Sequence, residues 1–284
     1  MLTDEHLTQF VTDGFVVLPD AVEVDHCRQL QQRVSAIVDE YDPAMASEAT
    51  RFSTVDQSHA TEQYFFDSAS TIGYFFEEGS FDDAGALQRP MGEALNKLGH
   101  AMHDLDPTFD GFSRQPWMAA AMQQVGMQDP VLLQTMYIFK PPRIGGEVTP
   151  HIDRTFLWTD PGSVVGIWVA IDDATVDNGC LWAIPGSHRQ PPRTRFRRHI
   201  NEDGTVRGEM DVLDPNPYST DGGVPLEAKR GTAVLLHGQL VHWSHPNTSS
   251  HSRHAFTLHV IDGATDYPAD NWIQRTEALP LRGF

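Results

Sequence analysis

Two candidate metal ligands stand close together in "TPHIDRT", residues 149–155. Successive side chains of a β-strand point to opposite faces, so His151 and Asp153 would share one face while Ile152 points to the other. The same spacing also occurs in ordinary strands that end at the surface. The pair therefore indicates a metal site only if the rest of the chain supplies a further ligand.

His242 is the strongest candidate for that further ligand among the C-terminal histidines. In "VHWSHPN" the alternation of a strand places His242 and Ser244 on one face. His237 in "LLHG" is the main rival, although its setting is typical of a strand end packed on the core. His188 in "IPGSH" is also able to reach the site from a loop, but a structural hydrogen bond is the simpler interpretation.

Two histidines and one carboxylate form a set that leaves one face of an octahedral metal open. With His151, Asp153 and His242 as the ligands, the set is typical of non-haem Fe(II), which uses the open positions for 2-oxoglutarate and O₂. We therefore predict Fe(II) as the metal, 2-oxoglutarate as co-substrate and O₂ as oxidant.

Arg253 supplies the cation that the far carboxylate of 2-oxoglutarate requires. It opens "RHAFTLHV", where Arg253, Ala255, Thr257 and His259 share one face of a strand. A guanidinium is always charged and forks onto carboxylates, so a buried arginine on an inward face implies a bound anion. The sequence predicts that Arg253 and Ser244 hold this carboxylate.

The elements that must position these residues are mostly short strands. After residue 130, "VLLQTMYIFK", "SVVGIWVAID", "GCLWAIPG", "GTAVLLHG" and "RHAFTLHVID" are β-rich and separated by turn residues, with Asn178-Gly179 a specific hairpin signal. This pattern predicts a double-sheet jelly roll or a closed barrel. The segment 188–230 is long, irregular and basic at its start, which is typical of a functional lid.

The first 130 residues are predicted to form a mostly helical scaffold. Thr3 can cap a helix that ends at Gly14, "FVVLP" follows as a short strand, and "EVDHCRQLQQRVSAIVDEY" has one apolar stripe. Residues 42–90 have a weaker pattern, interrupted by "QYFFD" and "GYFFEEGSF" as short strands or aromatic loops. Two further helices are expected at about 91–105 and 115–125.

Composition sets the broad class. A chain of 284 residues with 40% hydrophobic content can bury a large core, and a formal charge of −19 argues against nucleic acid or anionic membrane as a partner. The two cysteines, Cys27 and Cys180, imply neither a disulfide framework nor a zinc ribbon. With no signal peptide or membrane-spanning run, we expect a cytoplasmic protein, a monomer or a weak homo-oligomer.

The chain resembles the phytanoyl-CoA dioxygenase family, and within it most closely the branch of phytanoyl-CoA dioxygenase domain-containing proteins. The resemblance is carried by "LTDEHLTQFVTDGFVVLPD", "YIFKPPRIGGEVTPHIDRTFLW", "GIWVAIDDATVDNGCLWAIPGSH" and the block of His242, Ser244 and Arg253. It implies a mainly β protein with flanking helices: one dioxygenase domain over residues 1–284, in which a double-stranded β-helix (a cupin-like jelly roll) spans residues 131–284.

The same resemblance implies Fe(II) at His151, Asp153 and His242, and 2-oxoglutarate at Arg253 and Ser244. Three further residues that would line the co-substrate site are Lys97, Met136 and Trp168, in the matching stretches "NKLGH", "TMYIF" and "GIWVA".

Each of these three has a simpler interpretation. Lys97 would also suit the solvated face of a helix, and Met136 and Trp168 would suit the core. The family often has glutamine where this chain has Ile152, so a polar contact to the co-substrate is expected to be lost there. Asp153 is present, whereas the family's halogenases lack that carboxylate, so hydroxylation is favoured over halogenation.

The predicted reaction is hydroxylation of an unactivated C–H bond of a small organic substrate, coupled to decarboxylation of 2-oxoglutarate to succinate and CO₂. The arginines of residues 193–198, together with Arg143 and Arg154, suggest an anionic substrate such as an acyl-CoA or a small carboxylate. A solvated charge run is the simpler interpretation of these arginines.

Two other classes of function remain open. A zinc hydrolase or a cupin-like isomerase would use the same two histidines and aspartate, but a hydrolase has no need of Ser244 and Arg253. A binding or regulatory protein that has lost catalysis is the third class, and the intact set of ligands argues against it.

Overall fold

The computed structural model of the chain describes residues 1–42 and 63–284. The weakly patterned stretch at 42–90 therefore lies partly outside the described residues. Within them, no helix is long and apolar enough to cross a membrane.

Thr3 caps the first helix, as predicted, by accepting a hydrogen bond from the backbone N–H of His6. Gly14 ends the helix in the left-handed conformation at φ 82°, which glycine adopts without steric cost. The predicted strand and long amphipathic helix follow. These three elements are α1 (Asp4–Asp13), β1 (Phe15–Leu18) and α2 (Val24–Asp39).

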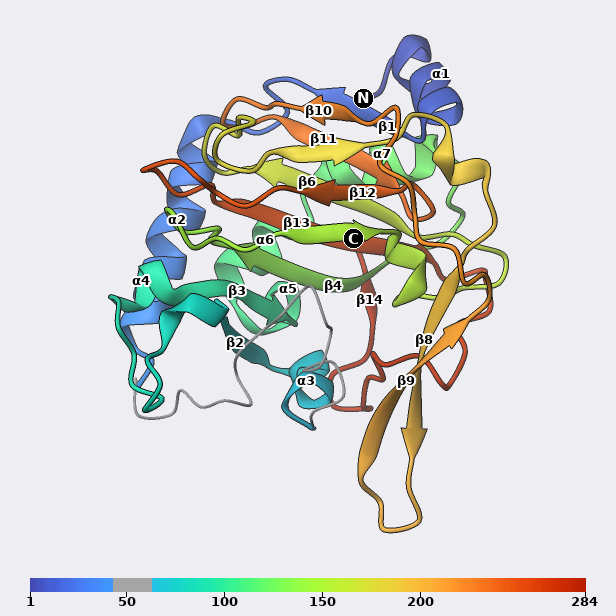
Figure 1. The fold of residues 1–284 in the computed structure, drawn as a ribbon. Coiled ribbons are helices and arrows are strands. Elements are labelled where there is room, and N and C mark those ends of the chain that lie inside the picture. Colours follow the sequence, from blue (N-terminus) through green and yellow to red (C-terminus); the bar gives the residue numbers. More distant parts are fainter. Residues whose placement is uncertain (43–62) are drawn as a thin grey trace.

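The strands form two facing antiparallel sheets, which confirms the predicted jelly roll (Figure 1). In spatial order the larger sheet contains β1, β11 (Ala233–His237), β6 (Val165–Ala170), β13 (Ala255–Asp262), β4 (Pro130–Ile138), β3 (Leu95–His100) and β2 (Ile72–Phe76), with β14 (Arg282–Gly283) paired to β4. The smaller sheet contains β10 (Val224–Leu226), β7 (Leu181–Ala183), β12 (His242–Ser244) and β5 (Val148–His151). All five predicted C-terminal strands are present.

The two faces of the larger sheet have different neighbours. On β13, Phe256, Leu258 and Val260 pack into a core with residues of helices α2, α6 (Pro107–Ser113) and α7 (Pro116–Gln124). Thr257 and His259, on the opposite face, line a cavity instead. The helices therefore cover one face, and the other face is left for the site.

The prediction of one helix at about 91–105 is wrong. A short helix, α4 (Met91–Ala94), leads into strand β3, and a second, α5 (Met102–Leu105), follows it. Strand β3 pairs with both β2 and β4, and five of the six residues in its burial pattern are buried. A strand that is buried on both faces shows no alternation of polar and apolar residues, so its leucines mimic a helical stripe.

Two other predictions of local structure are also wrong. "QYFFD" forms a helix, α3 (Gln63–Asp67), rather than a strand or a loop. The segment 188–230 is not irregular, because β8 (Thr194–Ile200) and β9 (Val206–Val212) form a hairpin that projects from the body of the molecule (Figure 1). The remaining short helices are 3₁₀ turns at η4 (Ser68–Ser70), η5 (Glu78–Ser80), η6 (Asp153–Thr155) and η7 (Ser187–Arg189).

Candidate active site

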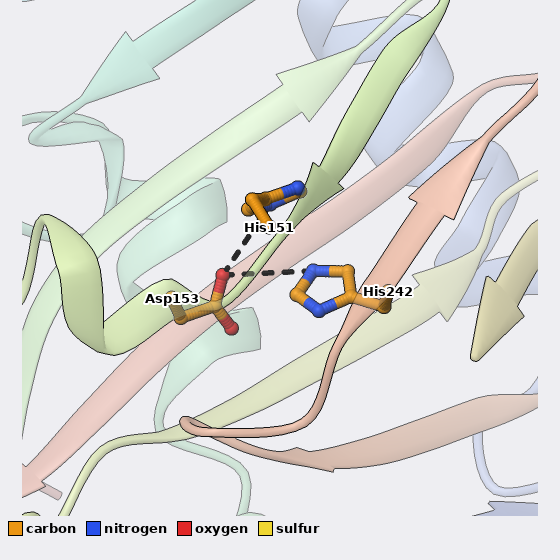
Figure 2. A group of neighbouring side chains, drawn as sticks. All are labelled: His151, Asp153 and His242. Atoms are coloured by element: carbon orange, nitrogen blue, oxygen red, sulfur yellow. Dashed lines mark ion pairs between the residues drawn. The ribbon is translucent and has the colours of Figure 1, made fainter. Parts of the chain in front are cut away.

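His151, Asp153 and His242 lie together, as the sequence predicts. Each offers one ligand atom, and these atoms all lie within 4.8 Å of one another. Strand β5 ends at His151, but Ile152 keeps an extended backbone, so the alternation of a strand continues to Asp153. Because His242 on β12 pairs directly with His151, the three side chains point toward one another (Figure 2).

Hydrogen bonds to the backbone orient both imidazoles. The Nδ1 atom of His151 lies 2.8 Å from the carbonyl oxygen of Thr149, and that of His242 lies 3.0 Å from the carbonyl oxygen of Leu240. A carbonyl accepts but cannot donate, so each Nδ1 carries the proton and each Nε2 presents a lone pair. Burial lowers the pKa of His151 to about 4, which keeps this ring neutral near pH 7.

The separations suit a metal ion better than they suit direct bonds. Oδ1 of Asp153 lies 3.9 Å from Nε2 of His151 and 3.6 Å from Nε2 of His242, and both distances are too long for hydrogen bonds. Two imidazole lone pairs and a carboxylate oxygen thus converge with no proton between them. This donor set fits a divalent first-row metal with open positions.

Arg253 is fully buried in the same cavity, as predicted. Its Nε donates to the carbonyl oxygen of Gly179 at 3.0 Å, and its guanidinium lies 5.7 Å from the ring centre of Trp168. Its Nη1 is buried and has no hydrogen-bond partner among the described residues. Since an unpaired buried donor on a charged group is costly, this nitrogen fits a bound carboxylate.

Ser244 contacts a cation that the sequence analysis missed. The ammonium group of Lys140 donates to Oγ of Ser244 at 2.9 Å and to the carbonyl oxygen of Gly146 at 2.7 Å. Gly179 has a left-handed φ of 83°, and a Cβ there would lie 2.3 Å from Cε of Lys140. The turn at Asn178-Gly179 therefore makes room for the lysine beside Arg253. The hairpin predicted there is wrong, because β6 and β7, the strands before and after this turn, belong to different sheets.

Lys97 is buried in the cavity wall and is not the solvated lysine of a helix. Burial lowers the pKa of Lys97 to about 7 and that of Lys140 also to about 7. Glu77, which the sequence analysis missed, is buried nearby and accepts hydrogen bonds from Asn96 and the backbone of Gly146. Its charge favours the protonated form of both lysines.

Met136 and Trp168 also line the cavity, on either side of Thr257 in the larger sheet. The cavity has a volume of about 220 Å³. Both sheets contribute to its wall, so it lies between them. Its apolar lining includes Phe65, Phe156, Leu157, Leu181, Trp243 and Trp272.

The rival histidines lie elsewhere. His237 accepts a hydrogen bond at Nδ1 from the backbone of Gln239, and His188 bonds the carbonyl oxygen of Val11 at 3.2 Å. Their rings pack on each other 5.0 Å apart, and neither is among the cavity residues. His188 therefore makes the structural hydrogen bond that the sequence favoured.

Ile152 is buried and is not part of the cavity wall. The residue between His151 and Asp153 therefore packs into the interior. The loss of a polar contact to the co-substrate at this position stays a prediction.

The arginines that suggested an anionic substrate do not line the cavity. Arg195 pairs with Asp270 at 2.5 Å and Arg197 with Asp211 at 2.6 Å. Arg193 approaches Asp214 at 3.8 Å. Outside this segment, Arg154 donates to Gln239 and Thr159, and Arg143 donates to Thr248.

His259 is a residue of the site whose role the sequence did not predict. Its Nε2 lies 3.2 Å from Oδ2 of Asp153, and its Nδ1 lies 3.1 Å from Nε2 of Gln134. The alternation that placed Arg253 and Thr257 on the inward face also placed His259 there. The signal was therefore present, whereas nothing in the sequence pointed to Lys140 or Gln134.

Known proteins with similar sequences carry consistent names. Residues 10–255 match the family model described as phytanoyl-CoA dioxygenase (PhyH). The chain is 41% identical over 280 residues to "Phytanoyl-CoA dioxygenase" of Arabidopsis thaliana, covering 97% of this chain and 95% of that protein. It is also 41% identical over 286 residues to "Phytanoyl-CoA dioxygenase domain-containing protein 1" of Mus musculus, covering 99% and 97%.

The fold has relatives among solved structures at much lower identity. The epimerase SnoN, solved in complex with Fe3+, alpha ketoglutarate and nogalamycin RO, superposes with a TM-score of 0.65. The match covers 99% of this chain and 92% of that one at 13% identity. At such identity the likeness concerns the fold.

Proposed function

The chain belongs to the phytanoyl-CoA dioxygenase family, and from that membership we propose that it hydroxylates an unactivated C–H bond of a small organic substrate. The enzyme is an Fe(II)- and 2-oxoglutarate-dependent dioxygenase that uses O₂. The observation that carries the proposal is the convergence of two imidazole lone pairs and one carboxylate oxygen within 4.8 Å.

His151, Asp153 and His242 would hold Fe(II). When bound, Fe(II) with 2-oxoglutarate and O₂ supplies the oxidising chemistry: 2-oxoglutarate becomes succinate and CO₂, with one oxygen atom entering it and the other entering the C–H bond of the substrate. The protein's own task is to hold the three ligand atoms on one side, which leaves the opposite positions open.

Arg253 would hold the far carboxylate of 2-oxoglutarate. Its free Nη1 is the donor that carboxylate needs, and Ser244 and Lys140 lie at the same end of the cavity. We propose that Lys97, Met136 and Trp168 complete this part of the wall. A zinc hydrolase would have no use for a buried arginine held ready for an anion.

The substrate would occupy the part of the cavity lined by aromatic side chains. Phe65 and Trp272 stack there at 4.3 Å between ring centres, and this wall excludes water from the C–H bond to be oxidised. No side-chain base is required, because the substrate carbon loses a hydrogen atom rather than a proton. The six arginines outside the cavity give no support to an anionic substrate, so we propose an apolar group at the site of oxidation.

Two measurements test the proposal. Anaerobic addition of Fe(II) and 2-oxoglutarate should produce a charge-transfer absorption band in the wild-type protein and none in Asp153→Ala. Metabolite pools can then be screened for substrate-stimulated succinate release, with mass spectrometry for a gain of one oxygen atom. Full turnover in Asp153→Ala would overturn the assignment of the metal site.

A further inference from the structure

His259 stands in a row of three residues that runs across the larger sheet. It lies opposite Gln134 on β4 and opposite Gly166 on β6. Directly opposed side chains on neighbouring strands lie within reach of each other. The row runs beneath Asp153, because a Cβ at Gly166 would lie 3.3 Å from Oδ2 of Asp153 and 3.6 Å from the ring of His259.

The contacts in this row indicate which ring nitrogen of His259 carries the proton. Nε2 of Gln134 is an amide donor, so Nδ1 of His259, at 3.1 Å, accepts from it. In a neutral imidazole the proton then sits on Nε2, which lies 3.2 Å from Oδ2 of Asp153. The nitrogen that carries the proton therefore lies close to one carboxylate oxygen of the proposed metal ligand, although the angle between them is not that of a hydrogen bond.

Gln134 donates this hydrogen bond although burial leaves its other polar atom unpaired. It is buried, and its Oε1 has no hydrogen-bond partner among the described residues. A buried amide with one unpaired oxygen is expensive to keep. Among the described residues, the side-chain amide of Gln134 has one hydrogen-bond partner, which is His259.

We propose that His259 is a positioning residue for the metal site, with its tautomer set by Gln134. Its Nε2–H lies 3.2 Å from Oδ2 and attracts this oxygen, which turns Oδ1 of Asp153 toward Nε2 of His151 and of His242. His259 is not a fourth ligand, because the group of side chains able to share one ion contains only His151, Asp153 and His242 among the described residues. The inference rests on the proposed metal site.

The test measures metal binding by the full-length, metal-free protein without co-substrate. Mn(II) is titrated and the free ion is followed by electron paramagnetic resonance. We expect His259→Phe to bind Mn(II) about 10- to 100-fold more weakly than wild type, the usual effect of removing a partner of a ligand. His259→Gln retains a donor amide and should regain most of the affinity. Gln134→Leu, which removes the donor that sets the tautomer, should also lower it.

A matched control is available in a second buried histidine. His103 lies 3.1 Å from Asp104 and is absent from the cavity wall, so His103→Phe should leave Mn(II) affinity unchanged. Wild-type affinity in both His259→Phe and Gln134→Leu would overturn the inference, as would a His259→Gln protein that binds no better than His259→Phe. If His259→Phe does not fold, wild-type affinity in Gln134→Leu alone overturns it. Equal Mn(II) binding by wild type and Asp153→Ala would instead overturn the metal site itself.

Discussion

Two buried aspartates, Asp104 and Asp153, occupy opposite electrostatic situations. Asp104 accepts hydrogen bonds from Arg114 at 3.0 Å and Arg282 at 2.8 Å, and Arg275 lies 3.6 Å away. Asp153 has no lysine or arginine in contact with it among the described residues. Its neighbours that can carry a charge are His151, His242 and His259.

Both carboxyl groups stay ionised, but for different reasons. Although burial raises each pKa, the hydrogen bond with His103 and those with arginines hold the pKa of Asp104 well below its usual range. For Asp153 the opposing influences come from His259 and His242. Three arginines thus lie within 3.6 Å of the Asp104 carboxylate, whereas among the described residues only histidines pair with Asp153. A buried carboxylate that no lysine or arginine of the protein neutralises indicates a bound cation.

Replacing each aspartate by asparagine should separate a role in stability, for Asp104, from a role in metal binding, for Asp153. We expect the largest effects from these two changes. Asp104→Asn removes the carboxylate that Arg114, Arg275 and Arg282 share and should lower the free energy of unfolding by about 3–5 kcal/mol, while Mn(II) affinity remains. Asp153→Asn should abolish turnover and metal-dependent stabilisation, with little loss of stability in the metal-free protein. Urea unfolding with and without Mn(II) measures both; a metal-free protein destabilised equally by the two changes would contradict the comparison.

Asp104 should contribute to the acid dependence of stability. Because its folded-state pKa lies below that of the unfolded chain, the unfolded state binds more protons as the pH falls below about 4, and stability is lost in that direction. Asp104→Asn should show a smaller loss between pH 4.5 and about 2.5. Urea midpoints at a series of pH values check this, and an unchanged slope would count against the role of Asp104.

The same comparison can be made between Arg253, in the cavity, and Arg275, beside Asp104, by measuring the binding of 2-oxoglutarate. Arg253→Met should weaken 2-oxoglutarate binding roughly a hundredfold, since it removes a buried charged partner. Arg275→Met, in the cluster around Asp104, should lower stability and leave 2-oxoglutarate affinity unchanged. Anaerobic titration of the charge-transfer band gives the affinities. Equal weakening in both variants would mean that Arg253 acts through the fold.

The fold was largely predictable where the pattern was local. Capping by Thr3 and Gly14, the amphipathic helix α2 and the turn-punctuated C-terminal strands all follow from short-range rules. Strand β3 was not predictable in this way, because its pairing with β2 and β4 determines its conformation and its burial on both faces hides the alternation. The hairpin β8–β9 was missed because its arginines masked the alternation of the strands.

The sequence predicted those site residues whose chemistry, when buried, requires a bound metal ion or an anion. His151, Asp153 and Arg253 attract attention because metal ligands and a buried guanidinium have few other uses. Lys140 and Gln134 gave no such signal: Lys140 follows a strand and precedes two prolines, and only the folded chain brings it to Ser244. The sequence alone therefore did not reveal the site residues that are brought together by contacts between strands far apart in the chain.

The buried lysines should make co-substrate binding depend on pH. Burial lowers the pKa of Lys97 and Lys140 to about 7, so both are protonated below pH 7 and increasingly neutral above it. A dianion binds better to the protonated form, so 2-oxoglutarate affinity should fall as the pH rises from 6 to 8.5, by roughly tenfold per lysine involved. Lys97→Met should reduce this slope, whereas Lys229→Met, at an exposed lysine paired with Asp173, should not.

The smallest effect is expected in the hairpin β8–β9. Arg195 and Arg197 already form partly exposed pairs with Asp270 and Asp211, and ion pairs that solvent can reach contribute about 0–1 kcal/mol. Replacing both arginines by methionine should therefore leave the KM of any accepted substrate within about fivefold of wild type. A larger rise in KM, confined to anionic substrates and suppressed by salt, would show that these arginines release their aspartates and bind the substrate. The cavity between the sheets would then be only part of the substrate site.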